Sequence, residues 1–176
     1  GVTHIDTANV YGMGKSEDAI GSYLAANPPA RDVFRIATKA SIRRKPEGGS
    51  FFDNSAKHLE SELDASLKRM GLDTVDLFYV HRRAADVPIE EVTETLAALV
   101  KKGKTKSIGY SEIAPTSLRR AHAVHPIAAV QSEYSLSTRS PEMGLVQTCA
   151  ELGVALVALS PVGRSFLTDN PLTLEA

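Results

Sequence analysis

Four side chains capable of acid–base chemistry follow three short apolar segments of the sequence. Asp6 ends the first segment and Tyr11 comes five residues later, while Lys39 and His81 end the next two segments. An ammonium group near a phenol favours the phenolate and lowers the pKa of the phenol, so Lys39 beside Tyr11 would make a workable general acid. Asp6 would hold that ammonium charged and oriented. His81 could donate a hydrogen bond to a substrate carbonyl or tune the tyrosine.

Two other interpretations of these residues remain open. Asp6 and Lys39 could form a buried ion pair without a catalytic role, although the order of the motifs favours a site. Lys39 could alternatively form a Schiff base with a carbonyl substrate, as strand-end lysines of some barrels do. Asp6 argues against the second interpretation, because a neighbouring carboxylate keeps the lysine protonated.

Short apolar segments alternate along the chain with longer segments of helical periodicity. The six predicted strands span residues 3–7, 34–38, 75–80, 105–109, 127–131 and 154–159. Most of them are almost continuously apolar, which is typical of parallel strands covered on both faces. The predicted helices span residues 16–26, 55–70, 88–103, 115–123 and 141–152. Gly71 follows the clearest of these helices as a C-terminal stop, and Pro88 suits the start of the next one.

Polar side chains stand at the end of every predicted strand: Asp6, Lys39, His81, Ser111, Gln131 and Ser160. Such groups converge on one point only if the strands form a ring, since an open sheet would spread them along an edge. We therefore predict an α/β fold of the (β/α)8 TIM-barrel class. This chain would supply about six βα units, strands 2 to 7, as a single incomplete barrel domain over residues 1–176. The first and last units are expected to lie outside this sequence.

Composition and charge argue against several other classes of protein. The formal net charge is −1 and no basic run is longer than Arg43-Arg44-Lys45, so neither nucleic acid nor an anionic membrane surface is an expected partner. Those three residues lie in the glycine-rich segment 41–53 and could attract an anionic substrate, although a solvated loop is the simpler interpretation. A single cysteine, Cys149, excludes a disulfide framework and favours a cytoplasmic location. No histidine spacing indicates a metal site.

Three stretches of this sequence resemble the aldo-keto reductases, and the resemblance extends over essentially the whole chain. They are Asp6-Thr7-Ala8-x-x-Tyr11-Gly12, Ile36-Ala37-Thr38-Lys39, and the run from Met70 through Val80 to His81. The resemblance implies that Asp6, Tyr11, Lys39 and His81 are the catalytic tetrad of that family, with Tyr11 as proton donor. No metal is implied.

The same resemblance implies a set of cofactor-binding residues. Ser111 and Gln131 match the positions that hold the nicotinamide carboxamide, and Ser160, Pro161, Val162 and Arg164 match the loop around the pyrophosphate. A guanidinium group such as that of Arg164 suits a pyrophosphate because it can donate two hydrogen bonds. Two departures from the family pattern are Glu112, where asparagine is commonest, and Leu159, where an aromatic ring often stacks on the nicotinamide.

The expected function is therefore an NAD(P)H-dependent reductase of aldehydes or ketones. The cofactor would be NADPH/NADP by resemblance, with NADH not excluded, and the partner a small carbonyl compound. The alternative is a regulatory, redox-sensing subunit of the same fold with slow turnover. The physiological substrate and the oligomeric state are left open.

Overall fold

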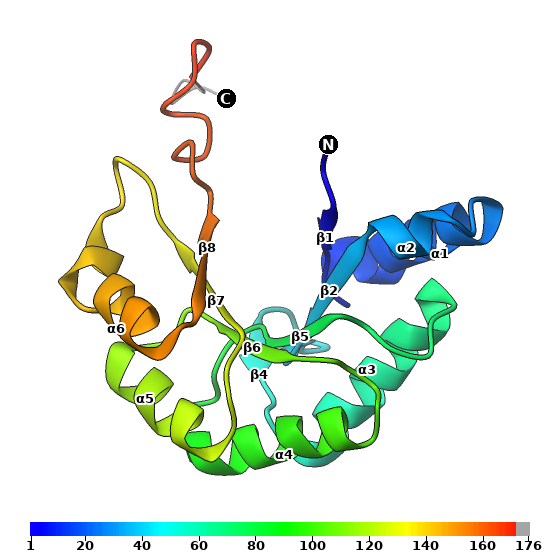
Figure 1. The fold of residues 1–176 in the computed structure, drawn as a ribbon, viewed down its shortest axis with the longest axis horizontal. Helices are drawn as coiled ribbons and strands as arrows, with labels where there is room; N and C mark the ends of the chain where they lie inside the picture. The colour runs from blue at the N-terminus through cyan, green and yellow to red at the C-terminus, as the bar shows by residue number, and fades with distance from the viewer. Residues whose placement is uncertain (172–176) are drawn as a thin grey trace.

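The computed structural model describes residues 1–171. Its main sheet contains six parallel strands in the order β1-β2-β5-β6-β7-β8. These strands are β1 (His4–Asp6), β2 (Arg35–Ala40), β5 (Leu77–Val80), β6 (Ile108–Ser111), β7 (Ala129–Glu133) and β8 (Ala155–Leu159). In Figure 1 the sheet curves into an open arc, with β1 and β8 at its two ends and the helices along its outer side. All six predicted strands are present, although β5 begins two residues later than predicted and β6 three residues later.

Helices lie between the successive strands of the main sheet, from β1 to β8, and cover the outer face of the arc. The helices are α1 (Lys15–Ala26), α2 (Ala30–Val33), α3 (Ala56–Met70), α4 (Ile89–Lys101), α5 (Pro115–Val124) and α6 (Leu145–Leu152), with 3-10 turns η1 (Tyr11–Gly14) and η2 (Ser140–Met143). Gly71 ends α3 in the left-handed conformation, at φ 65°, as the sequence predicted. None of the helices within residues 1–171 is long and apolar enough to cross a membrane.

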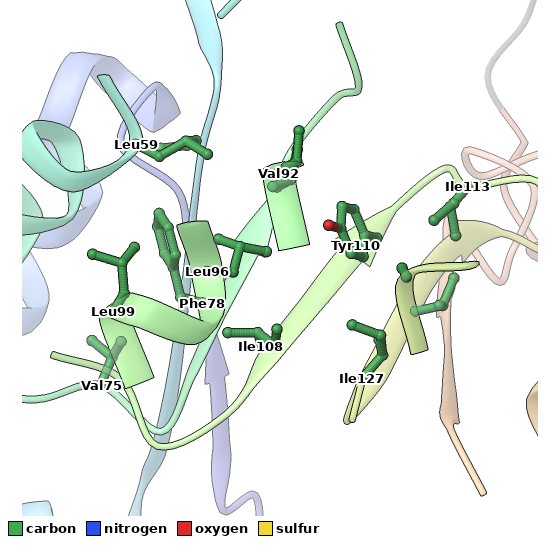
Figure 2. Packing of buried hydrophobic residues seen from close by; sticks show 14 of the residues in the cluster. Leu59, Val75, Phe78, Val92, Leu96, Leu99, Ile108, Tyr110, Ile113 and Ile127 are labelled. Atoms are coloured by element: carbon green, nitrogen blue, oxygen red, sulfur yellow. The ribbon is translucent and has the colours of Figure 1, made fainter. Parts of the chain in front are cut away.

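The core lies between the outer face of the sheet and these helices. Successive strand residues point to opposite faces of a sheet, so alternate side chains of β5 and β6 are directed outward. Figure 2 shows Phe78 and Ile108 packed against Leu96 and Leu99 of α4, all fully or almost fully buried. The sheet is therefore held in its curved shape by continuous apolar packing along its outer face.

Two predictions of local structure were wrong. The segment 41–53 is not an unstructured loop, because β3 (Ile42–Arg44) and β4 (Ser50–Phe52) pair there as an antiparallel hairpin. The predicted helix 141–152 is broken at Gly144, whose φ of 145° is incompatible with a continuous helix. Strand pairing across a turn that contains Gly48 and Gly49 explains the first difference, since both glycines adopt positive φ angles.

Helix α1 packs unusually closely on α3, which fixes the segment between β1 and α1. A Cβ atom at Gly21 would lie 2.3 Å from the carbonyl oxygen of Arg69 and 2.9 Å from the Cα atom of Met70. The fully buried carboxylate of Glu17 accepts hydrogen bonds from Arg69 Nε at 2.7 Å and from Thr38 Oγ1 at 2.6 Å. These contacts tie α1 to both α3 and β2.

We expect Gly21→Ala to destabilise the protein, although alanine favours a helix by about 1 kcal/mol over glycine. The added methyl group would meet backbone atoms of α3, and overpacking of this kind costs about 1–3 kcal/mol. Urea denaturation followed by circular dichroism would measure the change in the free energy of unfolding. The matched control is Ser22→Ala on the exposed side of the same helix, which should change stability by less than about 0.5 kcal/mol. Equal stability of the wild type and Gly21→Ala would show that α1 can move away from α3.

Candidate active site

Lys39, near the end of β2, carries a completely buried ammonium group. Its Nζ atom lies 2.5 Å from Asp6 Oδ2, 2.8 Å from the carbonyl oxygen of Thr7 and 3.4 Å from the hydroxyl oxygen of Tyr11. β1 and β2 are parallel neighbours, with Asp6 opposite Ala37 in the register. The ends of the two strands therefore bring the ion pair together, and Asp6 offsets the cost of burying the charge.

Tyr11 begins the 3-10 turn η1 directly beyond the Asp6 strand. Its ring lies edge-on to the His81 ring, with centroids 5.8 Å apart and an interplanar angle of 80°. The Lys39 Nζ atom is 4.9 Å from the centre of the Tyr11 ring. Tyr11 remains 37% exposed, so part of the residue faces solvent. The structure thus brings together the four residues of the predicted tetrad, whereas their catalytic roles stay predictions.

His81 follows β5 and is almost fully buried. Burial, together with the positive charges of Lys39 and Arg82, lowers the pKa of its imidazole to about 4, and Asp6 acts in the opposite direction. Its Nδ1 atom is buried without a hydrogen-bond partner among residues 1–171. The ring is therefore neutral at physiological pH and can donate one hydrogen bond, but it cannot act as an imidazolium acid.

Arg82 is a site residue that the sequence analysis missed. Its guanidinium Nη1 atom donates to the carbonyl oxygen of His81 at 2.8 Å and to Ser111 Oγ at 3.0 Å, while its backbone N–H donates to Ser41 Oγ at 2.9 Å. Arg82 therefore links the ends of β2, β5 and β6. Its position directly after His81 was the only signal of this role in the sequence.

Tyr79 lies under the ammonium group on the inner face of the sheet. The Lys39 Nζ atom is 6.0 Å from the centre of its ring, and burial raises the pKa of the Tyr79 phenol well above its usual range. A Cβ atom at Gly109 would lie 2.7 Å from that ring. Gly109 thus leaves the space that Tyr79 fills below the site.

Ser111 and Gln131, the two residues expected at the nicotinamide carboxamide, face each other across β6 and β7. Both are buried, and Ser111 Oγ already accepts a hydrogen bond from Arg82. Glu112, one of the departures from the family pattern, adopts a positive φ of 54° and accepts hydrogen bonds from Ser132 Oγ and the backbone N–H of Glu133. It therefore fastens the end of β6 to the end of β7.

The segment after β8 contains the residues expected around the pyrophosphate: Ser160, Pro161, Val162 and Arg164. It is a series of turns with positive φ angles at Ser160, Gly163 and Arg164. The guanidinium group of Arg164 is exposed and lies 3.1 Å from the carboxylate of Glu133. This segment extends away from the sheet beyond β8 (Figure 1).

No group of three or more histidine, cysteine or acidic side chains in residues 1–171 is arranged to hold a metal ion. His122, for example, accepts a hydrogen bond from the backbone N–H of Ile127 through Nδ1. Cys149 is a buried free thiol whose pKa is raised by burial.

The family model for the aldo/keto reductase family matches residues 1–175. The chain belongs to this family. It is 40% identical to aldo-keto reductase yakc [NADP(+)] of Schizosaccharomyces pombe over 172 residues, which are 96% of this chain and 50% of that protein. The chain spans about half the length of the curated aldo-keto reductases that it matches.

Solved structures of this family share the fold. The holo form of aldo-keto reductase AKR11C1 from Bacillus halodurans matches with a TM-score of 0.87 and 29% identity, over 100% of this chain and 58% of that chain. An aldo/keto reductase from Klebsiella pneumoniae, in complex with NADP and acetate, matches with a TM-score of 0.80 and 26% identity, over 96% of this chain and 56% of that one. The six parallel strands thus correspond to part of the predicted (β/α)8 barrel.

We expect the buried His81 to make the protein less stable as the pH falls from 6.5 towards 4. The folded state holds this ring neutral down to about pH 4, whereas the unfolded chain takes up the proton near pH 6.5. Unfolding therefore becomes easier on acidification, with about 1–2 kcal/mol lost between pH 7.5 and pH 5. Urea denaturation across this range would show a steeper pH dependence for the wild type than for His81→Gln. His4→Gln, on the exposed β1, is the control, and equal slopes for the wild type and His81→Gln would contradict the expectation.

Proposed function

We propose that residues 1–176 are an incomplete part of one barrel domain of an NADP-dependent reductase of aldehydes or ketones, with Tyr11 as the proton donor. The observation that carries this proposal is the position of the Lys39 ammonium group between the Asp6 carboxylate and the Tyr11 hydroxyl group. The name of the Schizosaccharomyces pombe relative includes NADP(+), and the Klebsiella pneumoniae structure contains NADP. Small carbonyl compounds are the proposed substrates and the cytoplasm is the proposed location.

Proton transfer from Tyr11 leaves a phenolate, which the neighbouring ammonium group stabilises. Lys39 is suited to this task because Asp6 keeps it in place and charged. The neutral His81 ring cannot supply the proton at physiological pH, so its role is to donate a hydrogen bond to the carbonyl oxygen. Tyr11 and His81 would then contact the same oxygen atom from two sides.

The inner face of the sheet offers groups that fit a nicotinamide. The Gln131 side-chain amide makes no hydrogen bond within residues 1–171, although the residue is only 5% exposed. An amide in this position can both donate to and accept from a carboxamide, and Ser111 lies beside it. The cofactor, when bound, would supply the hydride. The turns at Ser160–Arg164 would offer backbone N–H groups to the pyrophosphate. The guanidinium group of Arg164 would then either break its ion pair with Glu133 or contact both Glu133 and the pyrophosphate.

The structure gives little support to the Schiff-base alternative, and the comparisons do not favour the regulatory one. Lys39 is fully buried and its ammonium group already contacts three oxygen atoms. A carbonyl carbon could therefore reach Nζ only if those contacts broke. The relatives are named as reductases, and none of the names describes a regulatory subunit.

We expect Tyr11→Phe to abolish most carbonyl reduction and to leave cofactor affinity almost unchanged. The hydroxyl group is needed when the carbonyl oxygen becomes an alkoxide, so its loss should lower kcat by about 10²–10⁴-fold. Single-turnover kinetics with NADPH and a simple aldehyde would measure the chemical step, and fluorescence titration would measure NADPH binding. Tyr23→Phe, on the exposed surface of α1, is the matched control. An unchanged rate of reduction combined with weaker NADPH binding would make Tyr11 a binding residue instead.

The proposed nicotinamide contact leads to a separate expectation for Gln131→Leu. The leucine is similar in size but cannot form hydrogen bonds, and a missing pair of hydrogen bonds to a neutral group typically costs 1–3 kcal/mol, or about 10–100-fold in Kd. Fluorescence titration with NADPH measures this loss directly. Gln147→Leu on the exposed face of α6 serves as the control. Wild-type affinity in Gln131→Leu would remove this residue from the cofactor site.

A further inference from the structure

The hairpin β3–β4 stands directly after Lys39 and has two chemically different faces. Residues opposite each other in an antiparallel pair share a face, and successive residues alternate between faces. Ile42 pairs with Phe52 and Arg44 pairs with Ser50, so these four residues lie on one face, which we call the Ile42 face. Arg43 and its partner Phe51 lie on the other face.

The Ile42 face borders a pocket of about 380 Å³, whose lining includes Val10, Ile42, Arg44, Lys45, Gly49 and Ser50. Val10 immediately precedes Tyr11, so the pocket adjoins the segment that carries the proposed proton donor. A second pocket of about 350 Å³ is also lined by Val10, Ile42 and Arg44, and it continues towards α3. The first pocket therefore has an apolar side at Val10 and Ile42 and two cations, Arg44 and Lys45, nearer the hairpin tip. The second pocket is also lined by Glu62 and Arg69 of α3.

The positively charged side chains of the hairpin differ in whether an acidic side chain pairs with them. Arg43 forms an ion pair with Asp53 at 2.9 Å and lies over the Phe51 ring at 5.3 Å. Arg44 and Lys45 form no ion pair with any acidic side chain of the described chain, including Glu47 in the same turn. Two of the three cations of residues 43–45 therefore have no acidic partner within the described chain, and both line the first pocket. A carboxylate can accept charge-assisted hydrogen bonds from such groups, which are stronger than neutral ones.

We propose that this pocket binds the anionic end of the carbonyl substrate, so that the preferred substrates are aldehydes or ketones with an apolar body and a carboxylate. The proposal rests on the proposed reductase function. The apolar body lies against Val10 and Ile42, and the carboxylate lies between Arg44 and Lys45. Arg44 is two residues beyond Ile42 along the strand, about 6–7 Å at the usual rise per residue, so the carboxylate lies about that far along the hairpin from Ile42, which contacts the apolar body.

The test compares 4-carboxybenzaldehyde with its uncharged methyl ester as substrates for NADPH-dependent reduction. The wild type should have a higher kcat/KM for the carboxylate by about tenfold at low ionic strength, and added salt should reduce this preference. The double variant Arg44→Gln/Lys45→Gln should lose about tenfold for the carboxylate and remain within about twofold of wild type for the ester. The control Lys68→Gln/Lys101→Gln changes net charge equally through exposed lysines of α3 and α4 and should keep the preference.

Equal activity of the wild type on both substrates, or an equal loss on both in the hairpin variant, would overturn the proposal. Reduction of neither substrate would count against the proposed function instead. In that case calorimetric titration with terephthalate, a dicarboxylate of matching shape, tests the pocket alone. Binding to the wild type that is weakened about tenfold in the hairpin variant supports the site, and no binding to the wild type overturns it.

Discussion

A buried ammonium group is the constraint around which this site is built. Removing a charge from water costs several kcal/mol unless partners replace the lost solvent. Lys39 meets this requirement with Asp6, the carbonyl oxygen of Thr7 and the Tyr11 hydroxyl group. Asp6 and Thr7 belong to the neighbouring strand end and Tyr11 to the segment beyond it. The charge can therefore be buried only if β1 and β2 are paired in the observed register.

Further contacts fix the groups that surround this charge. Glu17 ties α1 to β2 and α3, which restricts the segment that carries Tyr11. Arg82 joins the ends of β2, β5 and β6, and Asn54 accepts a hydrogen bond from the backbone N–H of Ala84 at 2.8 Å while donating to the carbonyl oxygen of Arg82 at 3.1 Å. The rigidity of the site thus comes from buried polar contacts between strand ends, in addition to the apolar packing outside the sheet.

The strands and the convergence of their terminal polar side chains were predictable because both follow from short-range patterns, whereas the tetrad was named by resemblance to the family. Apolar segments mark the strands, and parallel pairing carries Asp6, Lys39 and His81 to the same edge. The hairpin was not predictable in this way, because its strands have three residues each and one of them is Ile-Arg-Arg, without an apolar alternation. Arg82 and Glu17 were missed because their roles depend on partners 29 and 52 residues away along the chain. The break at Gly144 was missed because a glycine can adopt either a helical or a positive φ angle, and the sequence alone does not show which one it adopts.

The way the hairpin is attached has a consequence for how this barrel can change over evolutionary time. The backbone N–H of Asp53 donates to the carbonyl oxygen of Ser41 at 2.8 Å, which closes the hairpin at its base, next to the strand that carries Lys39. Residues beyond that closure can be lengthened, shortened or replaced while the base keeps its geometry. The hairpin therefore behaves as an exchangeable module. New substrate preferences could be introduced on the same scaffold by exchanging residues 42–52, without changing the strand ends that carry Asp6, Lys39 and His81.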